Sequence, residues 1–190
     1  MQPYSLRSKK ESTMRALPKP LIAAAVITAI LGTLAHFAFD LSGQNRLVGL
    51  VSATNESTWE HMKLLFFPML LTSILLTWRL RADYPCILPS LLIGNFVGTF
   101  LIPVLFYTYS GILGRRIDAI NIAIYYICVI AAFYIAFRLA SRPCSDDLTR
   151  TLLLLTFIMI LLFFMFSYYP PELGIFADPQ KKITSLSNHR

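Results

Sequence analysis

Residues 55–80, NESTWEHMKLLFFPMLLTSILLTWRL, decide the fold because they join a polar segment directly to a long apolar one. The apolar part, from Leu64 to Leu80, can form a helix that crosses a bilayer, since about 20 helical residues span a hydrocarbon core of about 30 Å. The residues before it carry amide, carboxylate, hydroxyl and imidazole groups. The stretch therefore predicts a membrane helix that starts among hydrogen-bonding side chains at the membrane boundary.

The whole chain has the composition of a membrane protein. Of its 190 residues, 56% are hydrophobic and 14% are charged, whereas a soluble domain carries about 25% charged residues. Backbone groups cannot go unpaired in lipid, so each apolar run of sufficient length is expected to be a helix. We therefore predict an all-α fold, an integral membrane bundle of five transmembrane helices. The predicted spans are 21–39, 64–80, 86–107, 119–137 and 152–169.

The distribution of lysine and arginine predicts the orientation of the bundle. With the basic tail 1–20 in the cytoplasm, ten of the 17 Lys and Arg residues lie on the cytoplasmic side and seven on the other. Five crossings then place the tail 170–190 outside, and we expect a multi-pass protein of the cell (plasma) membrane. The net charge of +7 fits such anchoring loops. It does not predict nucleic-acid binding, because no basic stretch is interleaved with aromatic residues in a soluble module.

The three cysteines, Cys86, Cys128 and Cys144, are expected to be small buried apolar residues. Their odd number and wide spacing indicate neither a disulfide framework nor a cysteine-based zinc motif.

Helix packing is predicted at the segment GNFVG in the third span. Gly94 and Gly98 are four residues apart, and small residues at that spacing let two helices approach closely. Asn95 can donate a hydrogen bond across the same contact. The helix that packs on this segment is expected within the monomer. The alternatives are contact in a homodimer or with a partner membrane protein. The lipid bilayer is the expected surroundings in every case.

Polar side chains converge on the extracytoplasmic helix ends, because alternating spans bring these ends to one side. His36 and Asp40 are four residues apart and share one helix face. Asp118 and Asn121, three residues apart, also share one face of their helix. Ser57 and Glu60 have the spacing of a capping box, which starts a helix without implying catalysis. Six of the ten acidic residues lie on this side: Asp40, Glu56, Glu60, Asp118, Glu172 and Asp178.

A metal-dependent hydrolase acting on a lipid or a head group is one hypothesis for this set. Two His and a carboxylate leave a fourth position of a zinc ion open for water, and a further carboxylate serves as general base. In this hypothesis a divalent metal such as zinc is bound by His36, Asp40 and His61. The catalytic carboxylates are Glu56, Glu60 and Asp118. The substrate-binding residues are Asn55, Lys63, Tyr107, Arg115, Arg116 and Asn121.

Two other classes stay open on the same residues. The polar helix ends can form a site for a small solute or a lipid, as in a binding or transport protein, although the midplane positions are mostly apolar. The chain can also be a non-enzymatic accessory subunit that docks a partner. Each single residue also has a structural alternative: Asp118 as a helix N-cap, or Glu60 and Lys63 as a surface ion pair.

Three motifs carry a resemblance: GTLAHFAFDLSG (residues 32–43), NESTWEHMKLLFFP (residues 55–68) and YTYSGILG (residues 107–114). With them the chain resembles a family of small bacterial membrane proteins known only as a domain of unknown function. The similarity covers the first four spans and the segment YYPPELGIFADP. It implies a polytopic membrane protein, and it implies no activity, substrate or cofactor.

Overall fold

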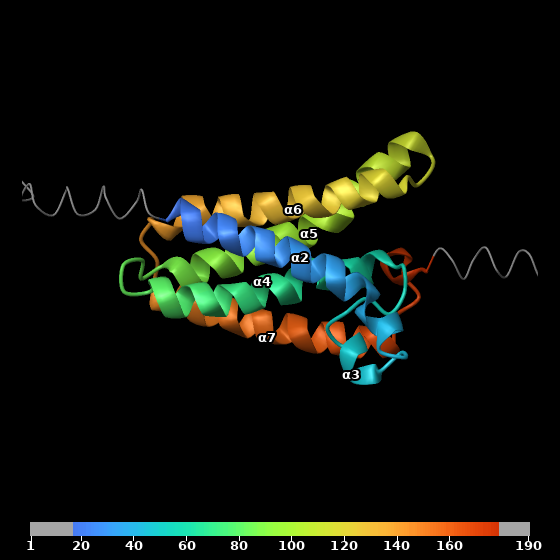
Figure 1. Ribbon diagram of the computed structural model, residues 1–190, viewed down its shortest axis with the longest axis horizontal. Coiled ribbons are helices and arrows are strands. Elements are labelled where there is room, and N and C mark those ends of the chain that lie inside the picture. Colours follow the sequence, from blue (N-terminus) through green and yellow to red (C-terminus); the bar gives the residue numbers. More distant parts are fainter. Residues whose placement is uncertain (1–16, 179–190) are drawn as a thin grey trace, which may run out of the picture.

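The computed structural model describes residues 17–178, and five long helices lie side by side in it (Figure 1). Residues 1–16 and 179–190 of the two predicted tails lie outside the described residues. The elements are α2 (Pro18–Leu41), α3 (Arg46–Gly49), α4 (Thr58–Leu80), α5 (Ile87–Leu113), α6 (Asp118–Ala140), α7 (Asp146–Tyr168) and the 3-10 turn η1 (Gly174–Phe176).

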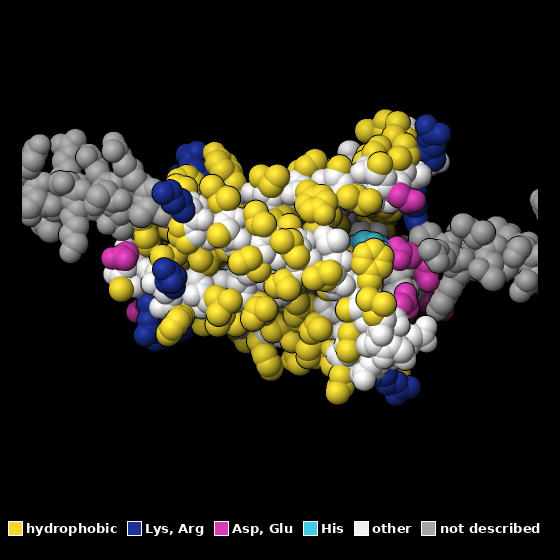
Figure 2. Space-filling view, in the orientation of Figure 1, with side chains coloured by type: hydrophobic (Ala, Val, Ile, Leu, Met, Phe, Trp, Pro, Cys, Tyr) yellow, Lys and Arg dark blue, Asp and Glu magenta, His cyan; other side chains and the backbone are white. Residues whose placement is uncertain are grey.

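The prediction of an all-α bundle with five membrane helices is confirmed. The five helices α2, α4, α5, α6 and α7 are each long and apolar enough to cross a membrane. Apolar side chains cover the middle of the molecular surface, and the charged side chains gather at its two ends (Figure 2). The chain is a multi-pass membrane protein.

The two ends of the bundle differ in what they hold (Figure 1). The site end holds the connection from α2 through α3 to α4, the turn between α5 and α6, and η1. The disulfide end holds the α4–α5 and α6–α7 connections. At the site end α5 and α6 project beyond the other helices, and we call residues 107–121 the α5–α6 tip.

Helices α4 and α7 begin six residues before their apolar runs, at Thr58 and Asp146. Serine N-caps explain both starts. The Ser57 hydroxyl accepts from the Glu60 backbone N–H at 3.4 Å, and the Ser145 hydroxyl accepts from the Leu148 N–H at 3.2 Å. A capped first turn can be polar, so apolar runs alone place these helix starts too late.

Helices α4 and α5 form the centre of the bundle. In the most apolar 18-residue segment of each helix, 56% of the residues are buried in α4 and in α5, against 22% in α2 and in α7. Phe163 of α7 packs against α4, with its ring 5.1 Å from Phe66 and 4.8 Å from Trp59 between centroids. The residues near the start of α4 are therefore held from several sides.

The GNFVG segment packs inside the monomer, against α6. A Cβ at Gly94 would overlap the Ala132 carbonyl oxygen, and one at Gly98 would lie 2.7 Å from the Ala132 Cβ. Asn95 does not join this contact, because its amide donates to the Phe66 carbonyl of α4 at 3.1 Å. One residue pair thus packs α5 on α6, and the asparagine between them joins α5 to α4.

A proline in α4 creates a further link between helices. Pro68 has no N–H, so the Leu64 carbonyl, four residues earlier, loses its usual helical donor. The Tyr125 hydroxyl of α6 lies 3.4 Å from that carbonyl and also contacts the Thr28 carbonyl of α2 at 3.2 Å. Gly32 of α2 leaves room for this hydroxyl, since a Cβ there would overlap it. Three helices therefore meet at Tyr125.

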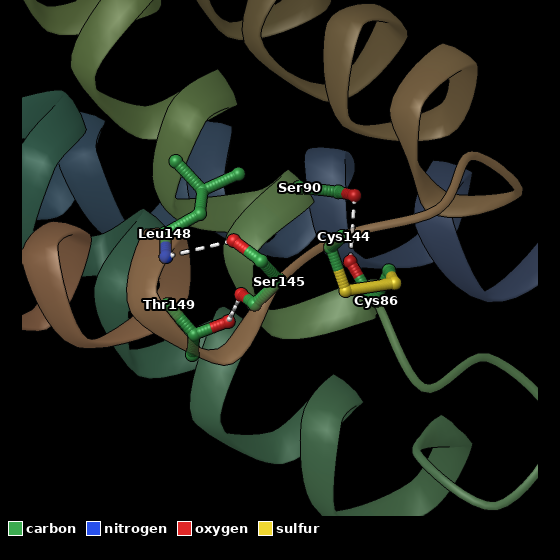
Figure 3. Close-up of a disulfide and its surroundings, with 6 residues drawn as sticks. All are labelled: Cys86, Ser90, Cys144, Ser145, Leu148 and Thr149. Atoms are coloured by element: carbon green, nitrogen blue, oxygen red, sulfur yellow. Dashed lines mark hydrogen bonds between the residues drawn. A yellow bond between two sulfur atoms is a disulfide. The ribbon is translucent and has the colours of Figure 1, made fainter.

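The expectation that the cysteines are unpaired is wrong for two of them. Cys86 and Cys144 form a disulfide that joins the α4–α5 connection to the α6–α7 connection (Figure 3). The bond closes a loop of 58 residues. Cys128 is buried and free, as expected. Wide spacing does not exclude a bond when helices bring two distant loops to the same end of a bundle.

Candidate metal site

Two histidines and a glutamate meet at the site end. His36 lies in the last turns of α2, His61 lies in the first turn of α4, and Glu56 lies in the connection just before the N-cap of α4. Helices α2 and α4 are neighbours in the bundle, so the end of one lies beside the start of the other. We call these three residues the His–Glu–His cluster.

The ligand atoms of the cluster face one another. Glu56 lies between the two rings: one carboxylate oxygen is 3.8 Å from His36 Nε2 and the other is 3.5 Å from His61 Nε2. The ring centroids of His36 and His61 are 5.4 Å apart. One potential ligand atom from each of the three residues lies within 4.8 Å of the others. About a third of each side chain is exposed, 30% for His36, 39% for Glu56 and 32% for His61, so solvent reaches the cluster.

A backbone contact orients the His61 ring. Its Nδ1 lies 2.9 Å from the Ser57 carbonyl oxygen, an acceptor, so Nδ1 carries the proton and donates it. Nε2, the ring nitrogen left to bind a metal ion, faces Glu56 at 3.5 Å.

A buried polar network of Thr54, Glu60, Lys63 and Ser167 joins the start of α4 to the connection before it and to the end of α7. Lys63 Nζ is 2.7 Å from Glu60 Oε2, and the two side chains are 0% and 1% exposed. Lys63 also donates to the Gly49 carbonyl at 2.8 Å and to the Ser167 hydroxyl at 2.7 Å. The Ser167 hydroxyl is 3.0 Å from Glu60 Oε1. The pair is therefore enclosed rather than at the surface.

The buried network fixes the segment that carries Glu56. Glu60 Oε2 accepts from the Thr54 backbone N–H at 2.8 Å and from the Thr54 hydroxyl at 2.9 Å. This carboxylate does not close the capping box, because the Ser57 N–H donates instead to Asn55 Oδ1 at 2.9 Å. Residues on both sides of Glu56 are thus held by side-chain hydrogen bonds.

The remaining predicted residues lie in two other places. Asn121 accepts from the Tyr109 hydroxyl within the α5–α6 tip, where Asp118, Arg115 and Arg116 are exposed. Arg116 lies over the Phe106 ring at 5.2 Å. The Tyr107 hydroxyl donates to the Gly174 carbonyl at 3.0 Å, which attaches η1 to α5. Figure 2 shows a hollow below the α5–α6 tip, with histidine surface and acidic side chains beside it.

The structure therefore divides the expected pocket. It brings together His36, Glu56 and His61, and it places Glu56 as a ligand candidate rather than a free carboxylate. Asp40 is exposed, one turn after His36, and is not part of the cluster. Lys63 is enclosed and contacts no open site. Ser167 and Thr54, which sequence reasoning missed, complete the network; no motif marks them, because their role depends on packing between distant helices.

Comparison with known proteins identifies a family. A model described as "Family of unknown function (DUF6512)" matches residues 9–184. The chain belongs to this family. No match was found among curated proteins or among solved structures. The family of unknown function supplies the membership and no activity, so the chemistry must be argued from the cluster itself.

Proposed function

We propose that this protein binds a divalent metal ion, zinc in the first place, through His36, Glu56 and His61. The observation that supports this is the meeting of two imidazole nitrogens and a carboxylate from three chain segments, partly open to solvent. Catalytic zinc sites use three protein ligands of these types and keep a fourth position for water. The hydrogen bond from His61 Nδ1 to the Ser57 carbonyl, which orients the ring, supports the same assignment.

We further propose that the bound metal serves hydrolysis of a lipid or of its head group. A metal ion lowers the pKa of bound water to about 7 and so supplies hydroxide near neutral pH. A metal held by His36, Glu56 and His61 would supply activated water for such a hydrolysis, in which water is added across the bond between the carbonyl or phosphoryl centre and its leaving oxygen. The location of the cluster at the ends of membrane helices suits a substrate that approaches from the bilayer.

Among the nearby carboxylates, Asp40 fits the role of general base best. Glu56 is occupied as a ligand, and Glu60 is buried in its ion pair with Lys63. Asp40 is exposed and follows His36 by four residues, on the same face of α2. This assignment replaces the initial hypothesis, in which Asp40 is a ligand and Glu56 or Glu60 is the base.

The proposal includes an orientation in the plasma membrane. With the amino terminus in the cytoplasm, ten of the 17 Lys and Arg residues lie on the cytoplasmic side. The His–Glu–His cluster then faces the extracytoplasmic side.

Elemental analysis of the purified protein tests the metal site. Wild type is expected to hold about one zinc ion per chain. His36→Ala, His61→Ala and Glu56→Ala are each expected to lose it, while His189→Ala, which removes the third histidine of the chain, is expected to keep it. Equal metal content in all five proteins would contradict the proposal. Retained metal without hydrolysis of any membrane lipid would favour the accessory-subunit alternative.

A further inference from the structure

A groove of about 780 Å³ runs between α2 and α6 on the lipid-facing side of the bundle. Its lining is apolar apart from a threonine and two tyrosine hydroxyls. On α2 it includes Ala25, Ala29 and Thr33, and on α6 it includes Tyr126, Phe133 and Phe137. Aliphatic residues of both helices line the groove as well, and the alanines of α2 leave open space opposite the aromatic rings of α6.

The lining of the groove ends on α2 at Thr33 and Leu34, just before His36. Ala29, Thr33 and His36 follow the spacing i, i+4, i+7, so His36 continues the face of α2 that lines the groove. At this end the Thr33 and Tyr126 hydroxyls are 3.3 Å apart, which places polar atoms where the apolar lining stops. A molecule lying in the groove therefore has its end about one helical turn from His36.

The dimensions of the groove fit a lipid chain. Its lining extends along α2 from Pro18 to Leu34, about 24 Å at 1.5 Å per residue. The hydrocarbon core of a bilayer is about 30 Å thick. A long apolar chain can therefore lie along most of the groove without leaving the membrane.

A second groove on α2 makes a useful contrast. It lies between α2 and α4 and includes Ala23, Ile27 and Leu76, with Lys19 and Arg79 in its lining. Both charged residues lie at the disulfide end, so this second groove opens away from the cluster. Of these two grooves, the α2–α6 groove is the one whose apolar lining continues toward the candidate metal ligands.

We propose that the α2–α6 groove binds the long apolar chain of the lipid substrate and presents the polar end of that lipid to the His–Glu–His cluster. This inference rests on the proposed metal-dependent function and names its substrate class: an amphiphile with a chain long enough to fill the groove. The groove selects for chain length, and the metal site selects for the group at the end of the chain.

A photoreactive probe tests the proposal. Zinc-loaded protein in phosphatidylcholine nanodiscs is labelled with palmitohydroxamic acid that carries a diazirine midway along the chain, and the labelled residues are mapped by mass spectrometry. The hydroxamate is a zinc-binding group, and acetohydroxamic acid serves as the probe without a chain. We expect the label on groove residues such as Val129 and Phe133.

Two matched variants of α2 separate the groove from the metal site. Ala25→Phe adds a ring inside the α2–α6 groove, and Ala23→Phe adds the same ring to the second groove. Ala25→Phe is expected to lower the labelling at least about fivefold, because the added ring occupies space in the groove that the chain of the probe would otherwise fill. Ala23→Phe is expected to label like wild type. Zinc content and acetohydroxamate binding are expected to be equal in all three proteins, which also shows that both variants fold.

The outcomes distinguish the two proposals. Zinc and acetohydroxamate bound normally, with label spread evenly over the lipid-facing helices or unchanged in Ala25→Phe, would overturn the groove and leave the metal site standing. Absence of zinc would overturn the proposed function. Groove labelling that persists after zinc is removed with a chelator would overturn the substrate assignment, because the chain would then bind without any direction from the metal.

Discussion

Lys63 carries its charge inside the protein with all three ammonium hydrogens matched to acceptors. Its Nζ lies 2.7 Å from Glu60, 2.8 Å from the Gly49 carbonyl and 2.7 Å from Ser167. An ammonium group has three donors and no acceptor, so no hydrogen-bonding capacity is left over. Lys63 binds Gly49 and Glu60 binds Thr54, and both residues lie in the connection that leads to Glu56. The Lys63–Glu60 pair therefore also helps to place Glu56. Lys63 and Glu60 act on the candidate site as positioning residues.

Substitution of Lys63 by methionine is expected to be strongly destabilising. Lys63→Met keeps most of the side-chain volume but leaves the Glu60 carboxylate buried without its counter-charge, a change that costs about 3–5 kcal/mol. The free energy of unfolding in detergent, measured by denaturant titration, checks this value. The double variant Glu60→Gln/Lys63→Met is expected to recover much of the loss, because no unpaired charge remains.

A matched control for Lys63→Met is available at the protein surface. Arg150 and Asp147 have the same i, i+3 spacing, 3.7 Å between their charged atoms, and side chains that are 79% and 93% exposed. Arg150→Met is expected to leave the unfolding free energy unchanged, since an exposed pair contributes little. If Lys63→Met were as mild as Arg150→Met, the account of the buried network would be wrong.

At the residue scale, the sequence predicted which side chains interact better than it predicted how deeply they are buried and what surrounds them. The spacing of Glu60 and Lys63 indicates an ion pair, and the structure contains it. Burial could not be predicted, because it depends on Ser167, which is 104 residues away from Lys63, and on a backbone carbonyl that no side chain identifies. Likewise, His36 and His61 were expected in one site, whereas the role of Glu56 depends on a loop conformation.

At the scale of elements, close helix contacts explain how the bundle is assembled. The Gly94–Gly98 face lets α5 approach α6, and Gly32 lets Tyr125 of α6 reach the backbones of α2 and α4. Between membrane helices, where lipid tails are as apolar as the side chains, such close packing and interhelical hydrogen bonds replace the hydrophobic driving force. The contacts hold α2 and α4 in the relation that brings His36 to His61.

A methyl group at the α5–α6 contact is expected to disturb it. Gly94→Ala places a Cβ against the Ala132 carbonyl, which is backbone and cannot rotate away, so we expect a loss of about 1–3 kcal/mol in unfolding free energy. Gly111→Ala in the same helix is the control: no atom lies within 4 Å of its Cβ, and alanine is the better helix former there. A stabilising Gly94→Ala, measured in the same titration, would contradict the packing described here.

The helices themselves were predictable from apolar runs, and their ends were less so. Each predicted span matches one long helix, because a run of about 20 apolar residues has no other stable form in a bilayer. The serine cap at Ser57 predicted the polar first turn of α4. The polar first turn of α7 was missed, because its cap at Ser145 lies outside the apolar run. The short helix α3 and the loop that carries Glu56 have no periodic pattern, so their course could not be predicted.

For the whole molecule, the proposed orientation and the disulfide point to different compartments for the disulfide end. The proposed orientation, which follows the Lys and Arg distribution, puts the disulfide end in the cytoplasm. Disulfides persist in oxidising compartments, and cytosolic thiols are kept reduced. Cys86 is half-buried and Cys144 is exposed, so reductants can reach the pair. In the proposed orientation the Cys86–Cys144 bond is therefore expected to be reduced in the cell and to close on oxidation.

Thiol labelling of intact cells checks this expectation. We expect a membrane-permeant maleimide to modify Cys86 and Cys144 without prior reduction, and an impermeant maleimide to modify neither. Cys128, which is buried, serves as the internal control that stays unmodified until the protein is denatured. If the impermeant maleimide modified Cys86 and Cys144, and did so only after a reductant was added, the disulfide end would lie outside. The His–Glu–His cluster would then lie at the cytoplasmic face.

The pairing of Cys86 with Cys144 shows the limit of hydropathy for the whole molecule. Five alternating spans place both residues at the same end, so the topology permits the bond. Which loops lie side by side depends on the lateral order of the helices, and apolar runs carry no information about that order. The same limit applies to the candidate site: the topology brings six acidic residues to one end, and lateral packing places only Glu56 between the histidines.

X-ray absorption spectroscopy at the zinc edge of the metal-loaded protein tests whether His36, Glu56 and His61 bind the ion. Binding by these residues predicts a shell of nitrogen and oxygen neighbours at about 2.0–2.2 Å with the multiple-scattering pattern of two imidazoles, reduced to one imidazole in His36→Ala or His61→Ala. Sulfur neighbours at about 2.3 Å, or a spectrum that is the same in wild type and in both histidine variants, would contradict it.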